Sequence, residues 1–236
     1  IGDSVLNGGS LTDDADTATG VLNALDVDIQ DRPVSFMNLS AGSWAPPQQL
    51  AYLKAYGTLD ANLVVLVLSS HDALGPMADD KPPYPTVKPW LATEELLMRY
   101  VLGFRRHIFA DDNRGWEATA AQVPAAVQRQ NNPTAVASWC LDEIVTLCAS
   151  KGIPVGAVLW PTMLEATRGT WDATVDPIVA VLDKRGVLSL DLLASSKDCI
   201  DRGCLIYRDG IHATEAGQKL LAGAILELTL KLAMPD

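Results

Sequence analysis

The chain has 236 residues, of which 48% are hydrophobic and 20% charged, and a net charge of −11. This is the composition of a folded protein, and the length suits a single domain over residues 1–236. A surface this acidic lacks the positively charged patch with which proteins bind nucleic acid. The longest apolar run, LVVLVL at 63–68, falls far short of the ~20 residues of a membrane span.

The first predicted element is the stub of a strand at Ile1, followed by a turn in the stretch IGDSVLNGG. A Gly-Asp-Ser turn needs a strand to hold it. We therefore expect several apolar residues before Ile1 in the native protein, and a secretion signal removed on maturation fits this start.

Four further strands follow in chain order. They are short and almost continuously apolar, as in strands buried on both faces of a parallel sheet, and lie at 33–40, 62–70, 153–160 and 187–193. Helical patterns alternate with them: one apolar stripe covers 136–148, and Thr214 is placed to cap a C-terminal helix. This alternation predicts a doubly wound α/β sandwich, in which ligands bind at the carboxyl ends of the strands.

The stretch from 73 to about 133 is too long for an ordinary connection between a strand and a helix. Its first part, PMADDKPPYPTVKPW, is rich in proline, and a helical pattern follows. We interpret it as an insertion over the strand ends, which forms either a lid or pocket wall, or a purely structural excursion.

Four cysteines occur along the chain. Cys140 and Cys148 lie about 12 Å apart along a helix, too far to bridge, and are expected as buried thiols. Cys199 and Cys204 enclose the short loop CIDRGC, and we predict a disulfide between them. Such a bridge indicates a secreted, periplasmic or extracellular protein. Neither pair has the spacing of a zinc site, and no metal site is predicted.

A serine nucleophile needs a base within hydrogen-bond reach, and that base needs an acid to orient it. Ser4 follows the first strand, and Asp209 and His212 lie three residues apart in the stretch RDGIHATEAG. Taken singly, each stretch is also compatible with an ordinary turn or helix cap. The chain has no G-x-S-x-G elbow, Walker loop or G-x-G-x-x-G motif, so neither an α/β-hydrolase site nor nucleotide binding is indicated.

Taken in order, IGDSVLNGG, NLSAGSW, LSSHDA and DGIHATEAG resemble the signature blocks of the SGNH family, also called GDSL hydrolases. The resemblance implies a flavodoxin-like three-layer α/β/α sandwich with a mostly parallel five-stranded sheet. It also implies an acyl-ester hydrolase or transferase that needs no cofactor. Its triad would be Ser4, His212 and Asp209, and the backbone N–H groups of Ser4 and Gly42 would line the oxyanion hole.

The third block departs from the family pattern. Gly-x-Asn-Asp reads here as Ser69, Ser70, His71 and Asp72, so His71 replaces the Asn whose amide completes the oxyanion hole. Three interpretations stay open. His71 donates to the oxyanion in place of the Asn, which we favour, or it acts as a second base, or its presence marks a site that has lost catalytic function. Asp72 could hold the imidazole through its own backbone or side chain, and the sequence leaves this open.

The expected substrate is a short-chain acyl ester, perhaps acetyl, in a small molecule or a carbohydrate. Trp44, two residues after Gly42, and Trp160, at the end of the fourth strand, are candidate substrate contacts, although large aromatic side chains also belong to cores. Two alternatives remain: an O-acyltransferase with the same triad, and a catalytically degenerate carbohydrate-binding protein. No oligomeric state is indicated.

Overall fold

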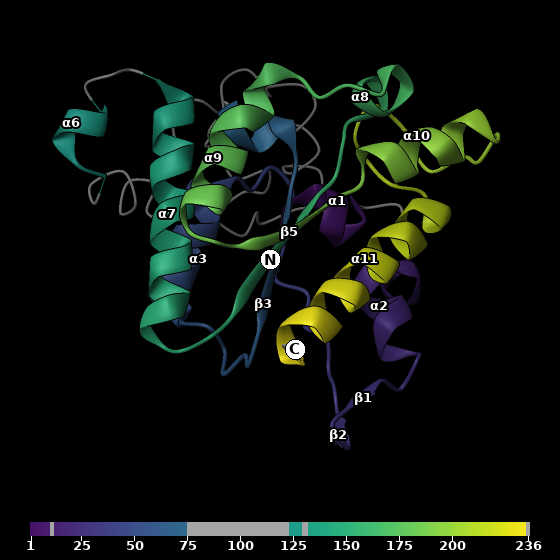
Figure 1. Ribbon diagram of the computed structural model, residues 1–236, viewed down its shortest axis with the longest axis horizontal. Coiled ribbons are helices and arrows are strands. Elements are labelled where there is room, and N and C mark those ends of the chain that lie inside the picture. The colour runs from purple at the N-terminus through teal and green to yellow at the C-terminus, as the bar shows by residue number, and fades with distance from the viewer. Residues whose placement is uncertain (10–11, 75–122, 129–131, 235–236) are drawn as a thin grey trace, which may run out of the picture.

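The computed structural model in Figure 1 describes residues 1–9, 12–74, 123–128 and 132–234. Its centre is a parallel sheet in the order β3 (Val64–Leu68), β4 (Val155–Leu159) and β5 (Leu188–Asp191). Val64 lies opposite Val155, and Gly156 lies opposite Leu188. The strands predicted at 62–70, 153–160 and 187–193 are therefore confirmed, and so is the α/β class with a parallel sheet.

Two short backbone stretches extend this sheet beyond β3. The α-amino group of Ile1 donates to the Val65 carbonyl at 2.7 Å, and the N–H of Val67 donates to the Ile1 carbonyl at 2.8 Å. Gly2 in turn forms an isolated parallel bridge with Ser40. Five neighbouring backbone stretches thus lie side by side, but only three of them are strands among the described residues.

The strand predicted at 33–40 is wrong for most of its length. Only Ser40 pairs with the sheet, and the chain before it forms a small hairpin of β1 (Asp28–Ile29) and β2 (Arg32–Pro33). In the described part of the chain no strand lies beside residues 34–39. A cavity of about 680 Å³ lies between this stretch and β3, so its backbone has no strand to pair with there. The backbone of Phe36 bonds instead to the side-chain amide of Asn23.

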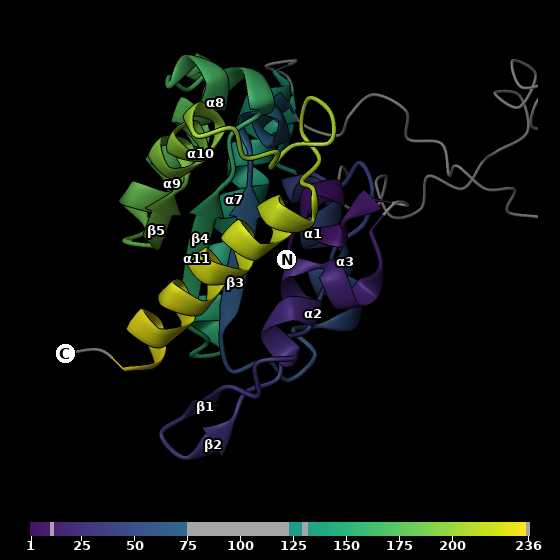
Figure 2. The ribbon, with the colours of Figure 1, turned by 90° about the vertical axis from the view of Figure 1, so that its right-hand side faces the viewer.

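Helices cover both faces of the sheet, which gives three layers (Figures 1 and 2). One face carries α3 (Pro46–Tyr56), α7 (Pro133–Ser150) and α9 (Asp176–Lys184), packed on Leu66, Leu68 and Leu159. The other carries α1 (Ser4–Asn7), α2 (Ala18–Asn23) and α11 (Glu215–Ala233), packed on Val67 and Val158. Both layers bury aliphatic side chains from the same strands, as the continuous apolar runs predict.

The caps of two long helices are visible in the sequence. Asn132 caps α7 through its side chain, which accepts from the N–H of Thr134, and Pro133 occupies the first helical position. The hydroxyl of Thr214 accepts from the N–H of Gly217 and starts α11, so the predicted cap is confirmed. These caps place the C-terminal helix directly after the stretch that contains His212.

The remaining elements lie at the carboxyl edge of the sheet or near it. They are η2 (Asp14–Asp16), η3 (Ser70–Leu74), α6 (Ala125–Gln128), α8 (Met163–Arg168), η6 (Ala173–Val175) and α10 (Leu193–Asp201). Most of the predicted insertion at 73–133 lies outside the described residues, and with it the prediction of a lid. Among the described helices, none is both long enough and apolar enough to cross a membrane.

All four cysteines are thiols. Cys140 and Cys148 are fully buried on α7, as expected. The predicted disulfide is not formed in this structure. Cys199 lies in the last turn of α10 and Cys204 shortly after it, and the N–H of Cys204 donates to the Cys199 carbonyl at 2.9 Å.

Candidate active site

Ser4 is the first residue of α1, directly after the backbone that joins the sheet edge. Asp3 caps this short helix by accepting from the N–H of Val5 at 2.8 Å. Gly8 ends it with φ +79°, a conformation that a residue with a Cβ rarely adopts. The buried side chain of Gln218 on α11 donates to the Val5 carbonyl at 2.7 Å, so α1 is tied to the C-terminal helix.

A continuous chain of hydrogen bonds joins three of the predicted residues. Nε2 of His212 lies 2.9 Å from Oγ of Ser4, and Nδ1 of the same ring lies 2.7 Å from Oδ2 of Asp209. Both distances fit strong hydrogen bonds. The two ends of the sequence therefore meet in a Ser-His-Asp arrangement.

The charge of Asp209 is fixed mainly by backbone groups. The N–H groups of His212 and Ile211 donate to its Oδ1 at 2.8 and 2.9 Å, and these bonds lower the pKa of Asp209 to about 2. The carboxylate is therefore ionised at neutral pH and accepts the Nδ1–H of His212. In neutral His212, this leaves the lone pair on Nε2 to accept from the Ser4 hydroxyl.

The stretch between Asp209 and His212 is held from both sides. Tyr207 and Ala213 form an antiparallel bridge, and the N–H of Arg208 donates to the His212 carbonyl at 2.8 Å. The N–H of Met163, at the start of α8, donates to the Gly210 carbonyl at 2.8 Å. A turn fixed at several points keeps the imidazole in place without help from a substrate.

The sequence predicts the backbone N–H groups of Ser4 and Gly42 as oxyanion donors, and this stays a prediction. Ser4 begins α1, so its N–H has no partner within the helix, and Gly42 lies in the turn that follows the bridge between Gly2 and Ser40. Among the residues that the structure describes, neither N–H donates to a protein acceptor. Both remain open to an oxygen of a ligand.

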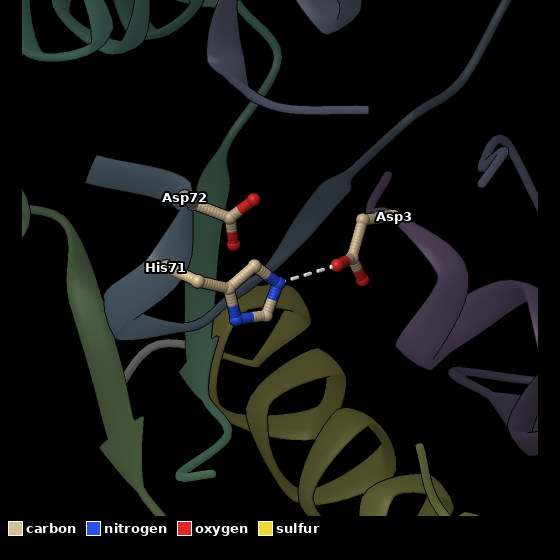
Figure 3. Close-up of side chains that lie close together, drawn as sticks. All are labelled: Asp3, His71 and Asp72. Carbon is tan, nitrogen blue, oxygen red and sulfur yellow. Dashed lines mark hydrogen bonds and ion pairs between the residues drawn. The ribbon is translucent and has the colours of Figure 1, made fainter. Parts of the chain in front are cut away.

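His71 lies in η3, at the carboxyl end of β3, and is bound by a carboxylate that the sequence did not single out. Its Nε2 lies 2.8 Å from Oδ2 of Asp3, whereas Asp72 accepts from the N–H of Ser69 at 2.7 Å (Figure 3). The side chain bonded to the ring is therefore that of Asp3 and not that of Asp72. Burial alone would lower the pKa of His71, but the bond to Asp3 and the charges of Asp72, Asp3 and Glu165 raise it to about 9.

Comparisons with known proteins place this geometry in a known fold. No family model matches the sequence, and no curated protein matches it. Among solved structures, one similar chain is a member of the lipolytic G-D-S-L family from Veillonella parvula, with 14% identity, a TM-score of 0.54 and coverage of 96% of this chain and 93% of that one. The chain has the SGNH/GDSL hydrolase fold.

Two more solved structures are similar to this chain over nearly its whole length. An acetyl xylan esterase, AlAXEase, has 11% identity, a TM-score of 0.55 and coverage of 96% of both chains. An α/β-hydrolase enzyme from the metagenome of Lake Arreo, Spain, has 18% identity, a TM-score of 0.54 and coverage of 97% of this chain and 92% of that one. At these identities the likeness concerns the fold, so function has to be argued from the site.

Within the SGNH/GDSL fold, Trp160 is not a surface residue. Its side chain is 0% exposed, its ring centroid lies 5.2 Å from that of Tyr207, and its indole N–H donates to the Ile211 carbonyl at 3.1 Å. The prediction of a substrate contact is therefore wrong. A tryptophan at a strand end reads the same in the sequence whether it turns into the core or toward a pocket, and here it supports the backbone next to His212.

Trp44 remains accessible. It is half-buried, and its ring packs at a centroid distance of 5.4 Å on Tyr52 of α3, which in turn packs on Tyr56 at 4.7 Å. The turn from Ala41 to Trp44 is closed by a backbone hydrogen bond, so the ring stays near Gly42. Its role as a substrate contact stays a prediction.

The SGNH/GDSL blocks also bring together the one group of potential metal ligands in the described part of the chain. Asp3, His71 and Asp72 each place one ligand atom within 4.8 Å of the others. The imidazole supplies a positive charge of its own next to Asp3, and one oxygen of each carboxylate already accepts a backbone N–H. The donor set fits an internal ion pair better than a metal site.

Sequence reasoning missed two residues that shape the site. Asp3 was overlooked because an aspartate directly before a helix is expected to act only as its cap. Its second carboxylate oxygen bonds to His71, which lies 68 positions away in the sequence. Gln218 was overlooked because it lies on an otherwise apolar helix. A glutamine among aliphatic side chains does indicate a structural role, because a buried amide needs hydrogen-bond partners, and here it bonds to Ala18 and Val5.

Proposed function

We propose that this protein is a serine esterase that hydrolyses short acyl esters, with acetyl esters of carbohydrates as the favoured class. The observation that carries the proposal is the bonded chain Ser4–His212–Asp209, with distances of 2.9 and 2.7 Å. The protein also shares its fold with a G-D-S-L lipolytic protein and with an acetyl xylan esterase, which supports the proposed esterase activity.

In the first half of the reaction, Oγ of Ser4 attacks the acyl carbon while its proton passes to Nε2 of His212. Asp209, ionised and bonded to Nδ1–H, stabilises the imidazolium that results. The negative oxygen of the tetrahedral intermediate accepts from the N–H groups of Ser4 and Gly42. The C–O bond to the alcohol then breaks, and the alcohol leaves with the proton from Nε2.

In the second half, water replaces the alcohol. Neutral His212 takes a proton from the water as its oxygen attacks the acyl carbon of the ester on Ser4. The second tetrahedral intermediate collapses, the bond between the acyl carbon and Oγ breaks, and the proton returns to Ser4. The products are the free acid and the regenerated enzyme, and no cofactor takes part.

The proposed preference for short acyl groups and sugar alcohols rests on the surroundings of the triad. The side chains of Asp209 and His212 are 52% and 28% exposed, so a bulky alcohol can approach from solvent. Trp44 presents a half-buried aromatic ring in the turn after Gly42, and aromatic faces suit stacking on sugar rings.

The experiment is hydrolysis of p-nitrophenyl acetate by the wild type and by Ser4→Ala, with Ser189→Ala on the exposed side of β5 as the matched control. We expect Ser4→Ala to lose at least ~10³ in rate and Ser189→Ala to lose none. A wild type no faster than Ser4→Ala contradicts the proposal and favours a binding protein. If a sugar acceptor diverts the acyl group from water, the protein is an acyltransferase instead.

A further inference from the structure

The helix that carries Ser4 is too short to hold itself in place. α1 has four residues, and a single helical turn orders several residues for very few internal hydrogen bonds. Its carbonyl groups therefore need partners from elsewhere in the chain. The side-chain amide of Asn38 donates to the Leu6 carbonyl at 3.1 Å. The side-chain amide of Gln218 donates to the Val5 carbonyl at 2.7 Å.

Of these two amides, only that of Gln218 is fully buried. Both of its ends are bonded, since Nε2 donates to Val5 while Oε1 accepts from the N–H of Ala18, the first residue of α2, at 2.9 Å. A helix leaves the N–H of its first residue without an internal partner. The amide fits in one orientation, because turning it over would bring N–H against N–H and oxygen against oxygen.

This bond lies directly behind the contact between the proposed nucleophile and its base. Val5 follows Ser4 in α1. The backbone N–H of Gln218 donates at 2.8 Å to the carbonyl of Thr214, the cap of α11, which comes two residues after His212. The Ser4–His212 and Val5–Gln218 bonds thus join the same two ends of the chain at neighbouring points, 208 and 213 positions apart. Two such bonds leave less freedom of rotation than one.

We propose that Gln218 is a positioning residue that locks α1 to α11, so that Oγ of Ser4 stays within hydrogen-bond reach of Nε2 of His212. This inference rests on the proposed function and adds to it a residue that touches neither the substrate nor the reacting atoms. The proton of Ser4 passes to His212 during the attack, so the rate depends on how closely the two atoms are held. Gln218 therefore acts on kcat rather than on binding of the ester.

The central variant is Gln218→Met, which keeps an unbranched side chain of similar size and removes both hydrogen bonds. We expect kcat for p-nitrophenyl acetate to fall by ~10²-fold with KM within about twofold, because a displacement of about 1 Å costs that much. Thr229→Val is the matched control, since Thr229 is a buried polar residue of the same helix whose hydroxyl bonds to the Ile225 carbonyl within α11. Its kcat should stay within about twofold of the wild type. Equal losses in the two variants overturn the proposal.

Gln218→Glu supplies a pH profile that a general loss of packing does not. A protonated glutamic acid has the donor and the acceptor of glutamine, whereas the carboxylate has no donor for the Val5 carbonyl. Neither α1 nor α2 contains an ionisable acid or base, and those on the adjoining segments are Asp3, Asp14, Asp16, His212, Glu215 and Lys219. Burial among more acids than bases raises the pKa of the new carboxyl.

The ratio of wild-type to Gln218→Glu kcat should therefore be ~10² at pH 9 and shrink below about tenfold at pH 5.5, where the carboxyl is protonated. The ratio of wild-type to Gln218→Met kcat should be the same at both values. Circular dichroism confirms that each variant is folded at both values, so that kcat reports the site and not the folded fraction. A Gln218→Glu ratio that does not change with pH overturns the proposal.

Hydrogen exchange separates this inference from the proposed function. The N–H of Asn7 donates to the Asp3 carbonyl inside α1 at 3.0 Å, and in Gln218→Met it should exchange ~10-fold faster because α1 opens more often. In Thr229→Val it should exchange at the wild-type rate. Unchanged exchange in Gln218→Met overturns the inference even in an active enzyme. An inactive wild type overturns the esterase and the catalytic role of Gln218 together, while exchange still decides whether Gln218 holds α1.

Discussion

The indole N–H of Trp160 donates to the backbone carbonyl of Ile211 at a distance of 3.1 Å, one residue before His212. Trp160 directly follows β4 and is fully buried, so this bond links the end of the sheet to the turn that carries the base. The donor is therefore a core side chain and the acceptor is the backbone of the turn. The placement of the imidazole therefore depends on packing inside the fold as well as on its hydrogen bond to Asp209.

Trp160→Phe removes this hydrogen bond and keeps most of the ring. We expect kcat to fall about tenfold with KM unchanged, because the turn and its imidazole gain freedom, and a displacement of about 1 Å at a catalytic group is costly. The free energy of unfolding should fall by about 1–3 kcal/mol, because a buried carbonyl loses its donor. Ester hydrolysis and denaturant unfolding measure the two effects.

The control for this change is Trp171→Phe, which also removes an indole hydrogen bond, to Oδ2 of Asp191 at 2.9 Å. That bond is exposed, so the activity should stay within twofold of the wild type. Equal losses of kcat in the two variants would contradict a specific role for Trp160.

Asp209→Asn should lower kcat by ~10³–10⁴, since an amide cannot stabilise the imidazolium and favours the wrong tautomer of His212. The pKa of Asp209 lies at about 2, because two backbone N–H groups bond to it, so the wild-type carboxylate stays charged from pH 4 upward. The loss should therefore persist at every pH from 5 to 9. A variant that regains wild-type activity anywhere in this range would exclude the proposed role of the carboxylate.

His71 should make stability depend on pH in alkaline solution. Its pKa is about 9 in the folded chain against ~6.5 unfolded, so the folded state binds the proton more tightly. The stabilisation is complete below pH 6.5 and is lost as the pH rises through 9. Denaturant unfolding at pH 6, 8 and 10 should show the wild type losing its advantage over His71→Gln.

The comparison with His71→Gln removes other groups that titrate in the same range. The α-amino group of Ile1 is one of them, since burial lowers its pKa from 8.0 to about 5 and its effect on stability has the opposite sign. Both proteins share that group, so it cancels. Asp72 does not cancel, because burial raises its pKa to about 8 and the charge of His71 lowers it, so both proteins are compared in an Asp72→Asn background. A difference in unfolding free energy that stays constant from pH 6 to 10 would show that His71 is not held as a cation.

The sequence predicted β3, β4, β5, α7 and α11 because each buries aliphatic side chains at the period of its own geometry. It failed at 33–40, where the apolar residues from Val34 to Leu39 have β-propensity but no neighbouring strand to pair with. Strand formation depends on backbone partners that a local pattern does not contain. A helix bonds within itself, which makes its sequence signal more complete.

The contrast between local signals and long-range partners also explains which parts of the site could be predicted. Ser4, Asp209 and His212 were identified from recognisable stretches, and the structure brings them into contact. The partner of His71 was left open by the sequence, because Asp3, which bonds to the ring, lies 68 positions away along the chain. Side-chain direction also decided Trp160, which turns into the core. Such directions follow from three-dimensional packing and are not encoded in spacing.

Trp44→Ala tests the proposed substrate class. If the ring stacks on the alcohol portion of a carbohydrate ester, KM for acetylated xylo-oligosaccharides should rise about tenfold, while kcat/KM for p-nitrophenyl acetate changes less than threefold. Tyr56→Ala is a suitable control, because Tyr56 is 67% exposed and lies at the far end of the same aromatic row. Equal effects of Trp44→Ala on both substrates would contradict carbohydrate stacking.

Cys199 and Cys204 test the proposal that the protein works in an oxidising compartment. Their thiols hydrogen-bond to each other, which raises the pKa of Cys199, and a backbone bond of 2.9 Å already closes the loop between them. Oxidised glutathione should therefore form one intramolecular disulfide, seen by mass spectrometry as the loss of two hydrogens, and the unfolding free energy should rise by about 2 kcal/mol. Buried Cys140 and Cys148 should stay reduced. Cys199→Ser is the control, and a wild type that keeps four free thiols under the same conditions would remove the support for export.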